Sequence, residues 1–114
     1  MRHLQTASVP LEQQPLGEGY SGPETAANAE LFATGDKTLQ IGVWSYAGEL
    51  ISGNSSENHQ AWVVLRGEVS VTLNNEVVRA GVGDTIVFEA PYGPKTLVAS
   101  ADFRAIWIAV QAER

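Results

Sequence analysis

From Thr38 onward, apolar and polar residues alternate with a period of two along several short segments of the chain. Three segments show this alternation: 38–43, 68–73 and 85–89. A period of two is typical of strands that bury one face of a sheet. The segment 103–110 is instead apolar on both faces and long enough to be a central strand. No segment has a helical period, so the sequence predicts an all-β domain.

Turn-forming residues separate the expected strands. Asn74 and Asn75 lie between the alternating segment 68–73 and residues 76–79, and asparagine tolerates positive φ, so they predict a tight β-hairpin. Glycines punctuate the same region at Gly42, Gly48, Gly53, Gly67, Gly81, Gly83 and Gly93. Many short strands with turns at this spacing indicate a sandwich or a barrel.

The first 37 residues are poorly patterned. We expect them to form an irregular, partly ordered N-terminal arm that precedes a barrel of residues 38–114. Prolines and glycines interrupt the arm at Pro10, Pro15, Gly17, Gly19, Gly22 and Pro23. The segment 23–32 is compatible with a short helical turn. Leu4, Val9, Leu11 and Leu16 are spaced as in an arm that is laid over a surface.

Composition excludes several classes of function. The chain has 114 residues, 44% of them hydrophobic and 18% charged, which is ordinary for one folded domain. A net charge of −6 argues against nucleic acid and anionic membranes as partners. No apolar run approaches the ~20 residues of a membrane helix, and no secretory signal is visible, so we expect a soluble, cytoplasmic protein. Without cysteine, and with only His3 and His59, thiolate sites and sites of three imidazoles from one chain are excluded.

Two regions of the sequence, 48–67 and 83–96, resemble the motifs of the cupin superfamily, whose members are small jelly-roll barrels. The stretch WVVLRGEV at 62–69 is similar to the most recognisable strand and turn of that family, and Gly83-Asp84 opens the second motif. The start GVW at 42–44 resembles a cupin branch that includes ureidoglycine aminohydrolases and a protein of ethanolamine utilisation. The resemblance implies a single-domain cupin jelly-roll barrel.

The metal-ligand positions of the family hold neutral side chains in this chain. In metal-dependent cupins, two histidines and a glutamate of the first motif and a histidine of the second converge inside the barrel. The resemblance assigns these positions to Asn54, Ser56, Gln60 and Thr96, or to Pro94 when the second motif is aligned without an insertion. Amides and hydroxyls are weak ligands that do not compensate the desolvation of a dication. We therefore expect no metal and no other cofactor.

The titratable residues near these motifs give no recognisable catalytic arrangement. Neighbouring positions of a strand face opposite sides, so His59 is expected to point outward, into solvent, if Gln60 points inward. If a metal is found, His59 and Glu57 are the first ligands to examine. We expect Lys95 to be a solvated loop amine, and Glu89 to be an ordinary carboxylate at a strand end. No triad, phosphate loop or carboxylate pair is visible.

A pocket at the mouth of the barrel remains. Six residues are expected to line it: Asn54, Ser56, Gln60, Trp62, Tyr92 and Thr96. Trp44 and Tyr46 are further candidates for its aromatic walls, and Tyr92 is the aromatic residue expected to be most exposed. Amides and aromatic faces suit a neutral polar ligand, such as a sugar or a ureide.

Three functional hypotheses stay open. The leading one is metal-independent binding of a small neutral polar molecule. The second is an enzyme with a non-standard metal site or metal-free acid–base chemistry. The third is a structural or interaction protein with a filled barrel. The resemblance also implies a homodimer that exchanges an N-terminal strand, because single-domain cupins commonly pair in this way.

Overall fold

A computed structural model of the chain describes residues 1–15, 20–22, 25–53 and 56–112. Within these ranges every regular element is a strand, and no helix is long and apolar enough to cross a membrane. The strands are β1 (Glu12–Pro15), β2 (Tyr20–Ser21), β3 (Thr25–Ala33), β4 (Leu39–Ser45), β5 (Gly48–Ser52), β6 (Asn58–Arg66), β7 (Val69–Leu73), β8 (Glu76–Ala80), β9 (Thr85–Phe88), β10 (Lys95–Ala99) and β11 (Arg104–Gln111).

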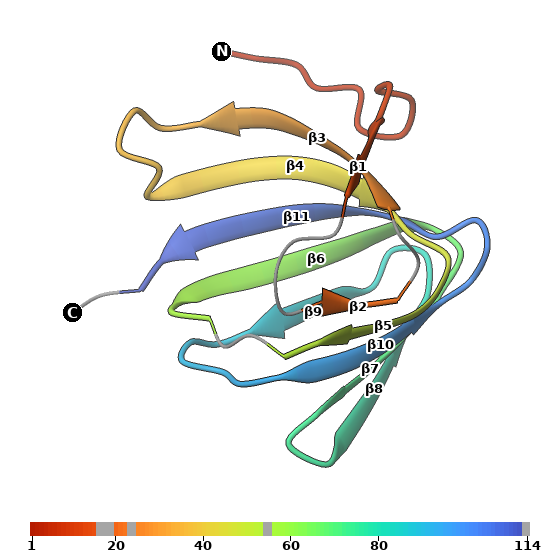
Figure 1. The fold of residues 1–114 in the computed structure, drawn as a ribbon. Helices are drawn as coiled ribbons and strands as arrows, with labels where there is room; N and C mark the ends of the chain where they lie inside the picture. Colours follow the sequence, from red (N-terminus) through yellow and green to blue (C-terminus); the bar gives the residue numbers. More distant parts are fainter. Residues whose placement is uncertain (16–19, 23–24, 54–55, 113–114) are drawn as a thin grey trace.

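The strands form two antiparallel sheets that face each other (Figure 1). One sheet has the order β1-β3-β4-β11-β6-β9, and the other has the order β2-β5-β10-β7-β8. Neighbours in both sheets are mostly distant in sequence, as expected of a jelly roll. The predicted all-β, single-domain fold is therefore confirmed.

The strongest sequence patterns correspond to strands. The apolar segment 103–110 forms β11, which lies between β4 and β6 and pairs with both. The alternating segments form β4, β7 and β9, and the residues after the predicted turn form β8. Asn74 and Asn75 join β7 to β8 with φ angles of 52° and 65°, which confirms the predicted hairpin.

The N-terminal region contains more regular structure than its pattern predicted. The helical turn expected within residues 23–32 is wrong, because residues 25–33 form β3, which pairs with β4. β1 pairs with β3, and β2 pairs with β5, so this region contributes to both sheets of its own chain. Small and polar residues such as Ala26 and Asn28 have weak strand preferences, and pairing with β4 overrides them. Exchange of a strand between two chains stays a prediction.

Arg104 attaches the first residues of the chain to the barrel. Its guanidinium donates hydrogen bonds to the carbonyl oxygens of Thr6 (3.0 and 3.2 Å) and Val9 (2.6 Å). On β11, Trp107 and Ala109 line the interior, so the alternation of the strand directs Arg104 to the outer face. Residues 6–9 therefore lie against the outside of the larger sheet, and burial lowers the pKa of Arg104.

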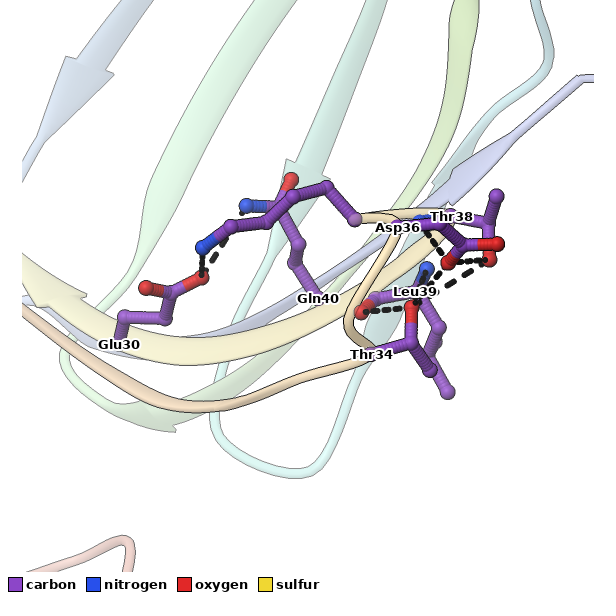
Figure 2. Close-up of polar contacts among 7 residues, drawn as sticks. Glu30, Thr34, Asp36, Thr38, Leu39 and Gln40 are labelled. Atoms are coloured by element: carbon purple, nitrogen blue, oxygen red, sulfur yellow. Dashed lines mark hydrogen bonds and ion pairs between the residues drawn. The ribbon is translucent and has the colours of Figure 1, made fainter.

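Asp36 organises the turn between β3 and β4 (Figure 2). Its Oδ1 accepts hydrogen bonds from the hydroxyl of Thr38 at 2.8 Å, the N–H of Thr38 at 3.2 Å and the hydroxyl of Thr34 at 2.9 Å. These donors, the Thr38 hydroxyl foremost, hold the pKa of Asp36 below its usual range. Lys37, between them, has a φ of 62°. The turn connects two strands that both contribute to the site described below.

The hydrophobic core occupies one end of the space between the sheets. It contains fully buried side chains of both sheets and of their connections, including Val64, Leu97 and Phe103. Inward positions of β6, β7, β10 and β11 supply most of the other core residues. Polar residues take the inward positions toward the opposite end, and a cavity lies there.

Candidate functional site

A cavity of about 400 Å³ opens between the two sheets. It lies where β6 and β10 begin and where β5 and β11 end. Its described lining residues are Gln14, Tyr20, Ala26, Asn28, Gln40, Trp44, Leu50, Ser52, Asn58, Gln60, Trp62, Lys95, Leu97, Trp107 and Ala109. The volume lies within the usual range for small-molecule sites, roughly 300–1,000 Å³. The lining combines indole faces and aliphatic groups with amides and one ammonium group.

Trp107 crosses the inner surface of the larger sheet because Gly42 has no side chain. The two residues are paired between β11 and β4, and a Cβ on Gly42 would lie 2.2 Å from the indole of Trp107. The indole thereby reaches the next strand, where its Nε1 donates to Oδ1 of Asn28 at 2.8 Å. One wall of the cavity is therefore built from three neighbouring strands.

Trp62 fixes a second amide in the same way. Its Nε1 donates to Oε1 of Gln60 at 3.2 Å, and both side chains face the cavity from β6. Trp62 also packs against Trp44 and Phe88, with ring centroids 5.1 and 4.7 Å away. Further ring contacts extend the cluster to Phe103 and Tyr92, so an aromatic layer separates the cavity from the core.

Lys95 is the only charged residue among the described lining residues. It begins β10, paired with Ser52 of β5 and Leu73 of β7. Its Nζ lies 5.2, 5.5 and 5.9 Å from the ring centroids of Tyr92, Phe88 and Trp62. These rings attract the ammonium group, whereas burial lowers the pKa of Lys95.

Gln40 contributes to the lining from β4, and its amide is held by Glu30 of the neighbouring strand β3. Its Nε2 donates to Oε1 of Glu30 at 3.1 Å, and the same oxygen pairs with Nζ of Lys37 at 3.4 Å (Figure 2). The Glu30 carboxylate is thus paired with Lys37 and is not among the described lining residues. Among the described residues, no carboxylate pairs with Lys95.

The structure brings some of the residues expected from the sequence together. Gln60 and Trp62 line the cavity, whereas Asn54 lies outside the described residues. Ser56 pairs with Tyr92 through backbone hydrogen bonds of 2.9 and 3.2 Å, beside the cavity lining.

Thr96 does not reach the cavity. It lies between Lys95 and Leu97, which both face inward, so its side chain takes the opposite face of the sheet. Its partners across the sheet, Ile51 and Thr72, are exposed on that outer face. The register therefore places Lys95 where the sequence analysis expected Thr96.

Three other expectations require correction. Tyr92 is buried, with 6% of its surface exposed, because it packs on Phe88 and on the ammonium of Lys95. Lys95 is a half-buried strand residue instead of a solvated loop amine. His59 is half-buried instead of exposed: its Nδ1 accepts a hydrogen bond from the N–H of Ala90 at 2.9 Å.

The donor set of the cavity does not fit a divalent metal. Among the residues that the structure describes, no cluster of three or more His, Cys, Asp or Glu residues is present. Gln60 already accepts from Trp62, and the hydroxyl of Ser56 donates to the carbonyl of Asn58 at 3.2 Å. The ammonium of Lys95 repels a cation, and the remaining amide oxygens are weak ligands.

Several lining residues were not anticipated from the sequence as ligand contacts, among them Asn28, Asn58, Lys95 and Trp107. For Lys95 a pattern was available. Leu97 and Ala99 lie two and four residues after Lys95, so the three side chains share one face of the strand. Leu97 and Ala99 belong to the core, which indicates that Lys95 also faces inward. Asn28 and Trp107 had no comparable pattern, because their contact depends on pairing across β4.

Comparison with known proteins supports the fold. No family model matches the chain, and no curated protein matches it. Solved structures do match, among them a predicted oxalate decarboxylase from Thermotoga maritima, with a TM-score of 0.74 and 12% identity over 97% of this chain and 100% of that one. The cupin domain of Cnp3 from Schizosaccharomyces pombe has a TM-score of 0.67 and 22% identity, over 92% and 70% of the two chains.

A third match is an ethanolamine utilization protein Q from Salmonella typhimurium. Its TM-score is 0.66, and its identity is 15% over 90% of this chain and 95% of that one. At such identities the likeness concerns the fold. The two antiparallel sheets, their strand order and these neighbours agree, and the chain is therefore a protein of the cupin fold.

Proposed function

We propose that this chain binds a small polar molecule, without a metal, in the cavity between its two sheets. The observation that carries the proposal is the lining: amide groups held by indole N–H donors, beside aromatic and aliphatic surface. Such a combination of fixed polar groups and apolar walls is typical of ligand sites. The volume of about 400 Å³ favours binding over a structural role with a filled barrel.

Binding is also favoured over acid–base catalysis. The titratable residues among the described lining are Tyr20 and Lys95, and no carboxylate or imidazole accompanies them. Proton transfer needs a donor and an acceptor with suitable pKa values on the two sides of the reacting group. A lone ammonium group and fixed amides instead orient a ligand.

The three tryptophans of the chain provide a direct test, because Trp44, Trp62 and Trp107 all line the cavity. We expect saturable changes in intrinsic fluorescence and in the three indole N–H resonances when a library of sugars, ureides and small organic acids is titrated. Failure of every compound to shift these signals would overturn the proposal. Elemental analysis of untagged protein after dialysis against divalent metals tests metal independence, and one tightly held metal per chain would contradict it.

A further inference from the structure

The ammonium of Lys95 faces the cavity without a negative partner among the described residues. No carboxylate lines the cavity within those ranges, and the one ion pair found there joins Lys37 to Glu30. The rings of Tyr92, Phe88 and Trp62 surround the Lys95 ammonium but carry no charge. A half-buried cation without a counter-charge is costly, and an anion that enters the cavity removes that cost.

The amides beside Lys95 present donors to the same space. An indole N–H can only donate, so Trp62 and Trp107 fix the oxygen atoms of Gln60 and Asn28 toward themselves. The NH₂ groups of both amides are consequently turned away from the indoles, and no described residue accepts a hydrogen bond from them. Both amides line the cavity.

The lining thus offers more donors than acceptors. It combines a cation with the unused NH₂ groups of two amides, whereas its acceptors are neutral. This imbalance favours a ligand that is rich in acceptors and negatively charged.

We propose that the ligand of this cavity is a small organic carboxylate, with its carboxylate group on Lys95, in a lining that also presents the NH₂ groups of Asn28 and Gln60. The inference rests on the proposed small-molecule function and names the class of ligand. It replaces the neutral ligand expected from the sequence, because Lys95 was then placed in solvent. The indole faces and Leu50, Leu97 and Ala109 give the carbon skeleton of such an acid an apolar surface.

Pairs of acids and amides of the same shape distinguish the effect of the ligand's charge on affinity from the effect of its shape. Benzoate and benzamide, and butyrate and butyramide, are titrated into the intact chain while tryptophan fluorescence and indole resonances are recorded. We expect each acid to bind at least about tenfold more tightly than its amide, because a charge-assisted hydrogen bond replaces a neutral one. Equal affinity for acid and amide would overturn the inference while leaving the small-molecule function intact.

Two charge-removing variants test the role of Lys95. Lys95→Met removes the charge and keeps the length of the side chain, and we expect it to lose the preference for acids while still binding amides. Arg79→Met, at an exposed position of β8 away from the cavity lining, is the control and should bind like the wild type. Full carboxylate affinity in Lys95→Met would refute the assignment. Because this variant loses a half-buried cation that has no described counter-charge, its thermal midpoint should not fall.

Two further measurements sharpen the result. Carboxylate affinity should fall as pH rises through the lowered pKa of Lys95, whereas amide affinity should not. The other described titratable residues on this side of the cavity are Tyr20 and Tyr92, and burial raises the pKa of Tyr92. Inorganic phosphate is the competing anion. Phosphate bound as tightly as the acids would indicate an oxyanion site and overturn the choice of a carboxylate.

Discussion

Replacing Gly42 by alanine tests how the cavity wall is built. The new Cβ would lie 2.2 Å from Cζ2 of Trp107 and 2.3 Å from Cε2, both in a rigid ring. Carbon atoms in contact are about 3.5 Å apart, so the indole must shift by about 1.3 Å. The shift withdraws Nε1 from Asn28, 2.8 Å away in the native wall.

The cost follows from three contributions. Overpacking of a well-packed site costs about 1–3 kcal/mol, and loss of the hydrogen bond to Asn28 costs about 1 kcal/mol. Alanine also lowers the conformational entropy of the unfolded chain, which stabilises the folded state by about 0.4–1 kcal/mol. We expect Gly42→Ala to lower the free energy of unfolding by about 2–3 kcal/mol, which corresponds to a thermal midpoint lower by roughly 10 °C.

Urea and thermal denaturation measure the loss, and tryptophan fluorescence reports displacement of the indole. Gly35→Ala is the matched control, because a Cβ there meets nothing within 4 Å. In a Trp107→Ala background the cost of Gly42→Ala should shrink without vanishing, since the carbonyl oxygen of Ala29 lies 2.6 Å from the new Cβ. A Gly42→Ala chain as stable as Gly35→Ala, with unchanged fluorescence, would refute the reasoning.

Two predictions concern parts of the chain outside the cavity. Arg104→Met removes the hydrogen bonds to the carbonyls of Thr6 and Val9. Amide exchange and proteolysis within residues 1–11 should therefore accelerate while the barrel stays folded. Unchanged protection of those residues would contradict the anchoring role of Arg104. Asp36→Ala should destabilise the chain at neutral pH. The folded pKa of Asp36 is lowered, so its stabilisation is present above about pH 3.9 and is lost as pH falls through the folded pKa. The difference between variant and wild type in urea denaturation should therefore shrink in acid, and a pH-independent difference would rule out this account.

Local patterns were sufficient to predict much of the fold. β4, β7 and β9 alternate strictly enough to be recognised, and Asn74-Asn75 has the chemistry of a two-residue hairpin turn. β3 was missed because alanine and asparagine carry little hydropathy contrast. Its pairing partner β4 supplies the hydrogen bonds that make it a strand. The pattern of a segment cannot reveal a partner that is distant in sequence.

The candidate site was predictable only in part. Gln60 and Trp62 follow from the spacing of the first motif, because a strand with period two fixes which of its residues share a face. The second motif contains a loop, and an error of one residue in its alignment exchanges the two faces of β10. Lys95 therefore lies where Thr96 was expected, and a charged group takes the place of a neutral one.

The sequence by itself determined the class of the fold, the positions of its best-patterned strands and the absence of cysteine and of a third histidine. These properties depend on composition and on periodicity within single segments, which need no knowledge of distant contacts. Only the tertiary structure decided that Trp107 passes over Gly42 to hold Asn28, and that Lys95 enters a cavity whose described lining holds no carboxylate. The physical reason is that the cavity lining is formed by inward-facing side chains of several strands that are far apart in sequence. Its charge and its free donors therefore depend on register and pairing, which no single segment contains.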